Sequence, residues 1–188
     1  MRVISGKFGG LRLESVKSDK TRPTTDKVKE SLFSMLGQYF DGGNFLDLFA
    51  GSGAVGIEAV SRGFDAATLV DRQFQAIKTI KDNVAKVNAA NQFTVIKGSA
   101  EKVLLKLAAD QAKFDMVFLD PPYKQQKMME TMAQLLELNL LNDDAIVVCE
   151  TDNTVSLPAE LNSYQQLKHK EYGLTVVWVY RLEGGNGK

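Results

Sequence analysis

The stretch that decides the fold is NFLDLFAGSGAVG, residues 44–56. An apolar run encloses one acid, Asp47, and three glycines follow it before a second apolar run begins. This order predicts a buried strand, a glycine turn and a helix. Glycine at the first two glycine positions leaves space for a ligand to approach the backbone, and the first N–H groups of the helix attract anionic or polar groups. The stretch therefore predicts a nucleotide-type binding loop, with glycines Gly51, Gly53 and Gly56.

Two further features indicate which ligand this loop takes. The glycine spacing fits a dinucleotide-binding loop, and Asp71 follows 20 residues after Gly51, where an acid can bind ribose hydroxyls. Asp47, however, would repel a pyrophosphate and suits a cationic or amino-bearing ligand better. The tetrad Asp-Pro-Pro-Tyr at 120–123 directly follows an apolar run. Together these features favour S-adenosylmethionine over a nicotinamide dinucleotide.

Strands and helices alternate through most of the chain, which predicts an α/β fold with a parallel sheet. In such a sheet ligands bind at the carboxyl ends of the strands, where Asp47, Asp71, Ser99 and Asp120 all fall. The last two strands form an antiparallel hairpin, and residues 3–4 and 11–13 form a small N-terminal hairpin. The predicted strands of the sheet are 45–49, 67–70, 93–96, 114–119, 146–149, 164–168 and 175–180, and the helices are 27–36, 54–62, 74–88, 101–109 and 128–138.

The charge is unevenly distributed, although the 188-residue chain has a formal net charge of zero. Residues 1–29 hold eight basic and three acidic residues, a net charge of +5, and the remainder holds 15 basic and 20 acidic residues, a net charge of −5. A basic arm on an acidic body suits a polyanion such as nucleic acid, and a solvated basic terminus explains the numbers equally well.

The composition also limits the compartment. A single cysteine, Cys149, excludes an intramolecular disulfide framework. The sequence contains no apolar run near the roughly 18 residues of a membrane span, and its first residues lack the apolar core of a signal peptide. We expect a cytoplasmic protein that does not bind membranes and, because it is one ordinary domain, a monomer.

Four segments of the sequence resemble the RsmD family, bacterial methyltransferases that modify the exocyclic N2 of a guanine in small-subunit (16S) ribosomal RNA. The segments are RPTTDKVKESLF (22–33), FLDLFAGSGAVGIEAVSRG (45–63), VDR (70–72) and DMVFLDPPY (115–123). The resemblance implies a class I S-adenosylmethionine-dependent methyltransferase with a Rossmann-like sheet of seven strands. It also implies three parts: a basic hairpin and arm that contacts RNA (1–24), the methyltransferase domain (25–183) and a disordered tail (184–188).

The resemblance also assigns site residues. One departs from the family, because Ser99 stands where an acid usually accepts from the adenine amino group, and a hydroxyl accepts more weakly than a carboxylate. The implied cofactor residues are Asp47, Phe49, Gly51, Gly53, Gly56, Asp71, Arg72, Ser99 and Ala100. The expected RNA contacts are Arg2, Lys7, Arg12, Arg22 and Thr24.

The tetrad suits methylation of an exocyclic amine, whose lone pair is delocalised into the base. The Asp120 carboxylate and the Pro121 carbonyl can each accept a hydrogen from the amine, which localises the lone pair. Pro121 and Pro122 contribute no N–H donor, and the Tyr123 ring can stack on the base. Methyl transfer to a positioned amine needs no metal, and S-adenosylhomocysteine is the other product.

Several alternatives remain open from the residues alone. The tetrad serves any exocyclic amine, so the protein could be a DNA adenine-N6 or cytosine-N4 methyltransferase, although no separate region is large enough to read a DNA sequence. A non-catalytic RNA-binding assembly protein with the same fold is a third hypothesis, and the glycine spacing also allows a dehydrogenase. Ribosomal RNA, within a small-subunit particle, is the partner expected first.

Overall fold

The structure is a computed structural model that describes residues 1–16, 26–122 and 125–184. The chain divides into two compact units, Met1–Ala100 and Glu101–Lys188, which are described separately below. Three groups of sequence predictions lie outside the described residues: Arg22 and Thr24, Tyr123, and all of the predicted tail except Gly184.

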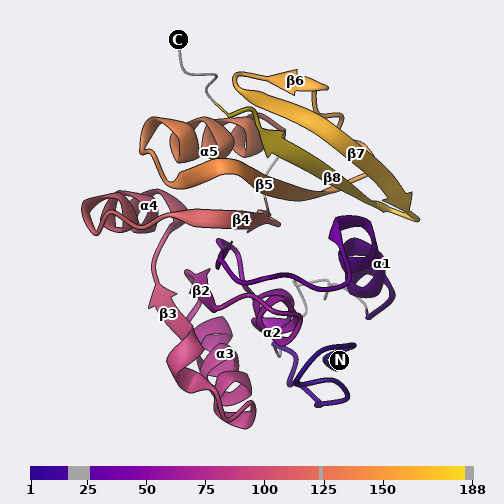
Figure 1. Cartoon of the computed structure of the whole chain (residues 1–188), viewed down its shortest axis with the longest axis vertical. Coiled ribbons are helices and arrows are strands. Elements are labelled where there is room, and N and C mark those ends of the chain that lie inside the picture. Colours follow the sequence, from indigo (N-terminus) through magenta and orange to yellow (C-terminus); the bar gives the residue numbers. More distant parts are fainter. Residues whose placement is uncertain (17–25, 123–124, 185–188) are drawn as a thin grey trace. The chain divides into compact units, whose positions relative to one another are not determined.

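The first unit contains a parallel sheet with the strand order β3-β2-β1. Helix α2 packs against β1 and β2, and α3 packs against β2 and β3 (Figure 1). The binding loop predicted from the sequence joins β1 to α2. The elements are α1 (Asp26–Leu36), β1 (Asn44–Asp47), α2 (Ala54–Ser61), β2 (Ala66–Asp71), α3 (Phe74–Lys86), the 3-10 helix η1 (Ala90–Gln92) and β3 (Phe93–Lys97).

The second unit combines parallel and antiparallel pairing. Strand β4 is parallel to β5, whereas β5-β8, β8-β7 and β7-β6 are antiparallel pairs. Helix α5 packs on β5. The elements are α4 (Ala100–Ala109), which begins at the boundary, β4 (Phe114–Leu119), α5 (Gln125–Glu137), β5 (Leu141–Asp152), β6 (Glu160–Leu161), β7 (Tyr164–Tyr172) and β8 (Thr175–Leu182).

The α/β class and the C-terminal antiparallel hairpin are confirmed, but the strand count is not. The described residues form eight strands, where the sequence predicted seven. The additional strand is β6, whose two residues pair with the start of β7. Strands β5 and β7 also run well beyond their predicted ends, because main-chain pairing continues through polar residues that interrupt the apolar pattern.

The N-terminal segment, residues 1–16, contains less strand than predicted. A single antiparallel bridge joins Arg2 to Arg12, supported by hydrogen bonds from the Val3 N–H to the Leu11 carbonyl at 2.9 Å and from the Gly10 N–H to the Val3 carbonyl at 2.9 Å. Val3 and Leu13 are buried. The segment is therefore a hairpin-shaped loop packed on the first unit rather than a two-stranded ribbon.

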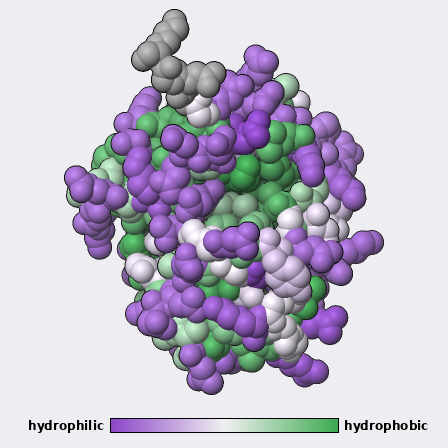
Figure 2. Space-filling model, viewed as in Figure 1, coloured by the Kyte–Doolittle hydropathy of each residue, from purple (hydrophilic) through white to green (hydrophobic). Residues whose placement is uncertain are grey.

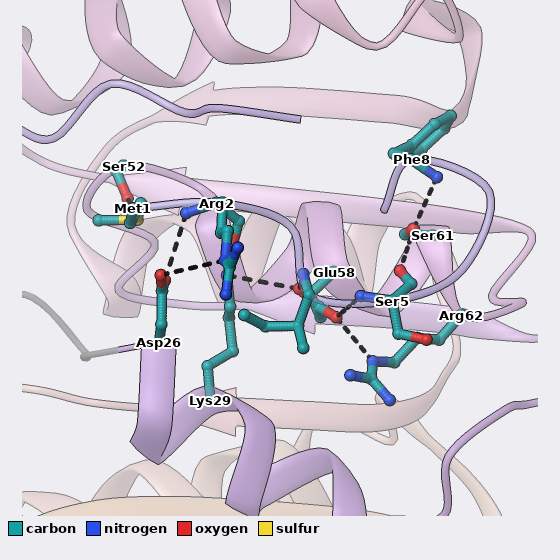
Figure 3. Close-up of polar contacts among 11 residues, drawn as sticks. Met1, Arg2, Ser5, Phe8, Asp26, Lys29, Ser52, Glu58, Ser61 and Arg62 are labelled. Atoms are coloured by element: carbon teal, nitrogen blue, oxygen red, sulfur yellow. Dashed lines mark hydrogen bonds and ion pairs between the residues drawn. The ribbon is translucent and has the colours of Figure 1, made fainter. Parts of the chain in front are cut away.

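Glu58, a fully buried acid in α2, fastens this segment to the helix (Figure 3). Its carboxylate accepts hydrogen bonds from the N–H groups of Ile4 at 2.8 Å and Ser5 at 3.0 Å. The same carboxylate pairs with Arg62 Nε at 2.7 Å and with Lys29 Nζ at 3.4 Å. A buried carboxylate is costly without such partners, so the four donors make its burial possible.

Lys29 extends this network to α1. Its ammonium group is buried and also donates to the Arg2 carbonyl. Burial lowers the pKa of Lys29, and the neighbouring Glu58 carboxylate opposes that shift. Arg62 donates in turn to the Gln38 carbonyl at 3.1 Å. The N-terminal segment, α1 and α2 therefore share one buried ionic cluster.

Ser61, at the end of α2, holds the turn of the N-terminal segment. Its hydroxyl donates to the Ser5 carbonyl at 2.6 Å and accepts from the Phe8 N–H at 2.9 Å, while its carbonyl accepts from the Lys7 N–H at 2.8 Å. Gly6 lies so close that a Cβ there would be 1.9 Å from the Ser61 carbonyl oxygen. Only glycine allows this approach.

Polar side chains cover much of the face seen in Figure 2, with apolar side chains between them, as on most folded proteins. Within the described ranges, no helix has the length and apolar character needed to cross a membrane.

The docking of the N-terminal segment can be tested with two glycines that share a backbone conformation. Gly6 and Gly10 both have φ of +85°, but a Cβ at Gly10 meets no atom within 4 Å. Gly10→Ala should cost about 1 kcal/mol from left-handed strain alone. Gly6→Ala should cost about 3 kcal/mol or more, because its methyl group collides with the Ser61 backbone. Urea denaturation of both variants measures the difference, and equal losses would contradict the described docking.

Candidate functional site

Strand β1 ends in Asp47, whose side chain is buried, and the loop to α2 follows at once. Two backbone hydrogen bonds fix this loop. The Ala50 N–H donates to the Val70 carbonyl at 2.8 Å, and the Gly53 N–H donates to the Ala50 carbonyl at 2.7 Å. Gly53 is the N-cap of α2 in a left-handed conformation, with φ of +79°. The predicted strand, glycine turn and helix are confirmed.

The three glycines of the loop have different reasons to be glycine. A Cβ at Gly51 would meet no atom within 4 Å, so this position borders open space. A Cβ at Gly53 would lie 3.3 Å from Leu69 Cδ1, and one at Gly56 only 2.2 Å from Leu69 Cδ2. The expectation that ligand clearance requires glycine at 53 is therefore wrong. At Gly53 the left-handed φ and the contact with Leu69 favour glycine, at Gly56 the close approach to Leu69 of β2 does so, and only Gly51 has the open side that a ligand needs.

Asp71, the last residue of β2, is bonded to this loop. Its Oδ2 accepts from the Gly51 N–H at 3.0 Å, and its Oδ1 accepts from the Gln73 N–H at 2.8 Å. A carboxylate has about four acceptor positions, so two remain for a ligand. The Asp71 carbonyl also accepts from the Gly98 N–H at 3.1 Å, which ties the end of β2 to the turn after β3.

The structure thus brings the strand ends of the first unit together as predicted. Ser99 is exposed in the turn after β3, and Ala100 is the half-buried first residue of α4. Phe49 is half-buried in the loop, and Arg72 is exposed beside Asp71. Among the described residues, no group of three or more His, Cys, Asp or Glu side chains is arranged to hold a metal ion.

One exposed aromatic residue near this loop was missed by the sequence analysis. Phe74 begins α3 and is 69% exposed, with Lys97 Nζ 5.5 Å from the centre of its ring. In the sequence Phe74 looks like the first apolar residue of a helix. Its exposure is a property of the folded structure, and no local pattern signals it.

Asp120 directly follows β4 in the second unit and is half-buried. Burial raises its pKa to about 6. Pro121 is buried and Pro122 is exposed, while Tyr123 lies outside the described residues. A carboxyl group with this pKa is mostly ionised at neutral pH and can still take up a proton, which suits a hydrogen-bond acceptor and proton acceptor.

Strand β5 places a second acid beside Asp120. Leu119 of β4 is the register partner of Cys149 in β5, so the next positions along the two parallel strands are Asp120 and Glu150. Cys149 is buried with its Sγ 3.7 Å from Met132 Sδ of α5, so Glu150 projects from the opposite face of the strand. The sequence analysis did not single out Glu150, because the pairing register that places it there joins residues 30 positions apart.

The predicted RNA contacts of the N-terminal segment differ in their surroundings. The side chains of Arg2 and Arg12 are exposed, and Arg2 Nε lies 3.9 Å from Asp26 Oδ2. Lys7 Nζ donates to Gln92 Oε1 at 2.6 Å and lies 5.0 Å from the centre of the Phe8 ring. Lys7 therefore also helps to hold the segment on the first unit.

Comparison with known proteins gives the family. Residues 1–181 match the family described as conserved hypothetical protein 95. An Escherichia coli protein named ribosomal RNA small subunit methyltransferase D is 32% identical over 97% of this chain and 90% of its own. The chain belongs to the RsmD family.

Other relatives agree with the RsmD family assignment. A Bacillus subtilis protein, named provisionally as the rRNA methyltransferase YlbH, is 46% identical over 98% of this chain and 100% of its own length. A solved Escherichia coli structure, named provisionally as a methyltransferase, has a TM-score of 0.82 at 30% identity and covers 98% of each chain. The fold is the Rossmann-like fold of methyltransferases.

The RsmD family match covers nearly all of the described chain. It begins at residue 1, so the N-terminal segment belongs to the family's common structure, and it runs to residue 181 in β8. The loop after β1 and the tetrad after β4 both lie inside the match.

Proposed function

We propose that this protein transfers a methyl group from S-adenosylmethionine to the exocyclic N2 of a guanine in small-subunit ribosomal RNA. RsmD-family relatives named as small-subunit rRNA methyltransferases support the reaction and the class of substrate. The observation that carries the proposal is the open side of Gly51, in a loop bonded to the Asp71 carboxylate.

The residues of the first unit fit this cofactor. When bound, S-adenosylmethionine supplies an electrophilic methyl group on a positively charged sulfonium. Asp47 and Asp71 supply negative charge for a cationic, amino-bearing ligand. The acceptor positions left on Asp71 suit two ribose hydroxyls. Phe49 lies in the loop and Arg72 lies next to Asp71, while the Ser99 hydroxyl and the Ala100 backbone would contact the adenine.

Asp120 and Pro121 would act on the target amine. The Asp120 carboxylate and the Pro121 carbonyl accept hydrogen bonds from the amino group, which concentrates the lone pair on nitrogen. When the amine nitrogen takes the methyl group that bound S-adenosylmethionine would supply, with S-adenosylhomocysteine as the other product, Asp120 would take up the proton that the amine loses. Pro122 and Tyr123 would complete the tetrad, with the Tyr123 ring stacked on the base.

The neighbouring Glu150 supports guanine as the base. Neighbouring strands lie roughly 4.8 Å apart, so Asp120 and Glu150 place two hydrogen-bond acceptors next to each other at the strand ends. Guanine presents two adjacent donors, N1–H and the N2 amino group. Adenine and cytosine present a bare acceptor nitrogen beside their amino group, which a carboxylate would repel. This difference favours guanine over the DNA amine alternatives.

The exposed Arg2 and Arg12 suit phosphate contacts, together with Arg22 and Thr24. We also propose that the substrate is RNA within a small-subunit particle, that the target base is unstacked before reaction, and that the enzyme is a cytoplasmic monomer.

The role of Asp120 has a pH signature. Because only the ionised carboxylate can take up the proton that the amine loses, wild-type methyl transfer should rise as the pH passes through about 6 and then level off. Asp120→Asn should lose at least about 100-fold in rate. Burial raises the folded-state pKa from the ordinary 3.8 to about 6, so stability falls as the pH rises from about 4 to about 6 and stays lower above that. The Asn variant should therefore be more stable than wild type at pH 8 and equal to it below about pH 4.

The experiment follows labelled methyl from S-adenosylmethionine into small subunits, their naked RNA and duplex DNA, with digestion to nucleosides. The control is Asp152→Asn, an exposed acid at the end of β5, which should behave like wild type. Label in N2-methylguanosine is the expected result. Label in DNA would instead establish a DNA adenine-N6 or cytosine-N4 methyltransferase. No label on any substrate would leave only the hypothesis of a non-catalytic RNA-binding protein.

The role of Glu150 in recognising guanine can be tested at the methylated nucleotide, once the labelling experiment has identified it. Small-subunit RNA carrying 2-aminopurine there keeps the 2-amino group but has no hydrogen on N1. Wild type should prefer guanine by about 10- to 100-fold in kcat/KM, from one well-placed hydrogen-bonded pair. Glu150→Gln can donate to the bare nitrogen, so its preference should fall about tenfold, while Asp152→Asn keeps the wild-type ratio. An unchanged ratio in Glu150→Gln would remove Glu150 from base recognition.

A further inference from the structure

Asn83 in α3 is a fully buried amide whose hydrogen-bonding groups are all used by backbone of two other segments. Its Oδ1 accepts from the Glu14 N–H at 2.7 Å. Its Nδ2 donates to the Glu14 carbonyl at 2.9 Å and to the Ser52 carbonyl at 2.9 Å. One side chain therefore joins Glu14 to Ser52, although 38 positions separate them in the sequence.

The proposed function assigns a different ligand to each of these two segments. Ser52 stands between Gly51 and Gly53 in the loop that would hold the cofactor. Glu14 follows Arg12 in the N-terminal segment that would contact RNA. The segment meets the loop a second time, because the Ser52 hydroxyl donates to Met1 Sδ at 3.4 Å (Figure 3).

This bonding leaves little freedom for independent movement. The Met1 carbonyl accepts from the Leu13 N–H at 3.0 Å, and Leu13 is buried next to Glu14. A shift of the segment must move the Asn83 amide with it or leave buried polar groups without partners, which is unfavourable. The same constraint applies to a shift of Ser52.

We infer that Asn83 is a positioning residue that links the binding of RNA on the N-terminal segment to the binding of cofactor in the glycine loop. The inference rests on the proposed function. A ligand that orders either segment also orders the shared amide, so the second ligand loses less conformational freedom when it binds. The coupling is positive and, by thermodynamic linkage, the same in both directions.

The variant that tests this link is Asn83→Asp. It keeps the size of the side chain and an acceptor for the Glu14 N–H, but it loses both donations and turns a carboxylate oxygen toward a backbone carbonyl. The matched control is Lys86→Gln on the same helix. Lys86 Nζ bonds Glu14 Oε1 at 2.9 Å at the surface, so this change removes a contact to the segment without touching the loop.

The experiment titrates the full-length chain with S-adenosylhomocysteine by calorimetry, with and without saturating small-subunit RNA, and repeats the titration in the reverse order. In wild type and Lys86→Gln, each ligand should raise the affinity of the protein for the other ligand by the same factor, about 5- to 50-fold. In Asn83→Asp, the factor should fall to near one, and affinity for S-adenosylhomocysteine alone should drop about tenfold. A merely structural role would lower folding stability and leave the factor unchanged.

A second measurement needs no variant and covers the case in which Asn83→Asp fails to fold. Hydrogen exchange of wild type without cofactor should slow in residues 48–56 when RNA is added. Unchanged exchange there, or a wild-type coupling factor of one with methylation intact, overturns the inference and leaves the proposed function standing. Failure of wild type to bind S-adenosylhomocysteine at all overturns both.

Discussion

The buried carboxylate of Glu58 is the interaction on which the arrangement of the first unit depends. It has charged or N–H partners in the N-terminal segment, in α1 and at the end of its own helix. Because α2 begins at the glycine loop, the group that fastens the N-terminal segment lies on the helix that carries the candidate cofactor site. A buried acid with several donors fixes geometry even where its net contribution to stability is small.

Residues of the candidate site both hold the local backbone and leave groups or space for a ligand. Asp71 holds the Gly51 N–H and the start of α3 while keeping acceptor positions for a ligand. Gly51 leaves the open space, and Gly53 and Gly56 allow the close packing of the loop on β2. In the second unit the register of β4 and β5 puts two acids side by side, of which Asp120 belongs to the tetrad.

Local patterns in the sequence predicted the elements whose structure depends on neighbouring residues in the chain. The strand, loop and helix around Gly51 follow from apolar runs and glycine spacing. Five of the strands follow from the alternation of strands and helices, and the last two were predicted as an antiparallel hairpin. The two-residue β6 has no pattern of its own and exists only through pairing with β7. The roles of Glu58 and Asn83 could not be predicted for the same reason, since all their partners except Arg62 lie between 25 and 70 positions away along the chain. An acid in an apolar helix gives no sign of the N–H groups that will bind it.

The most direct test of the account is the N2-methylguanosine content of small-subunit RNA from cells that lack this protein, compared with the same cells supplied with the wild-type chain. The account predicts that one such nucleoside per subunit is missing without the protein and returns with it. Identical nucleoside content in the two RNAs would contradict the proposed reaction.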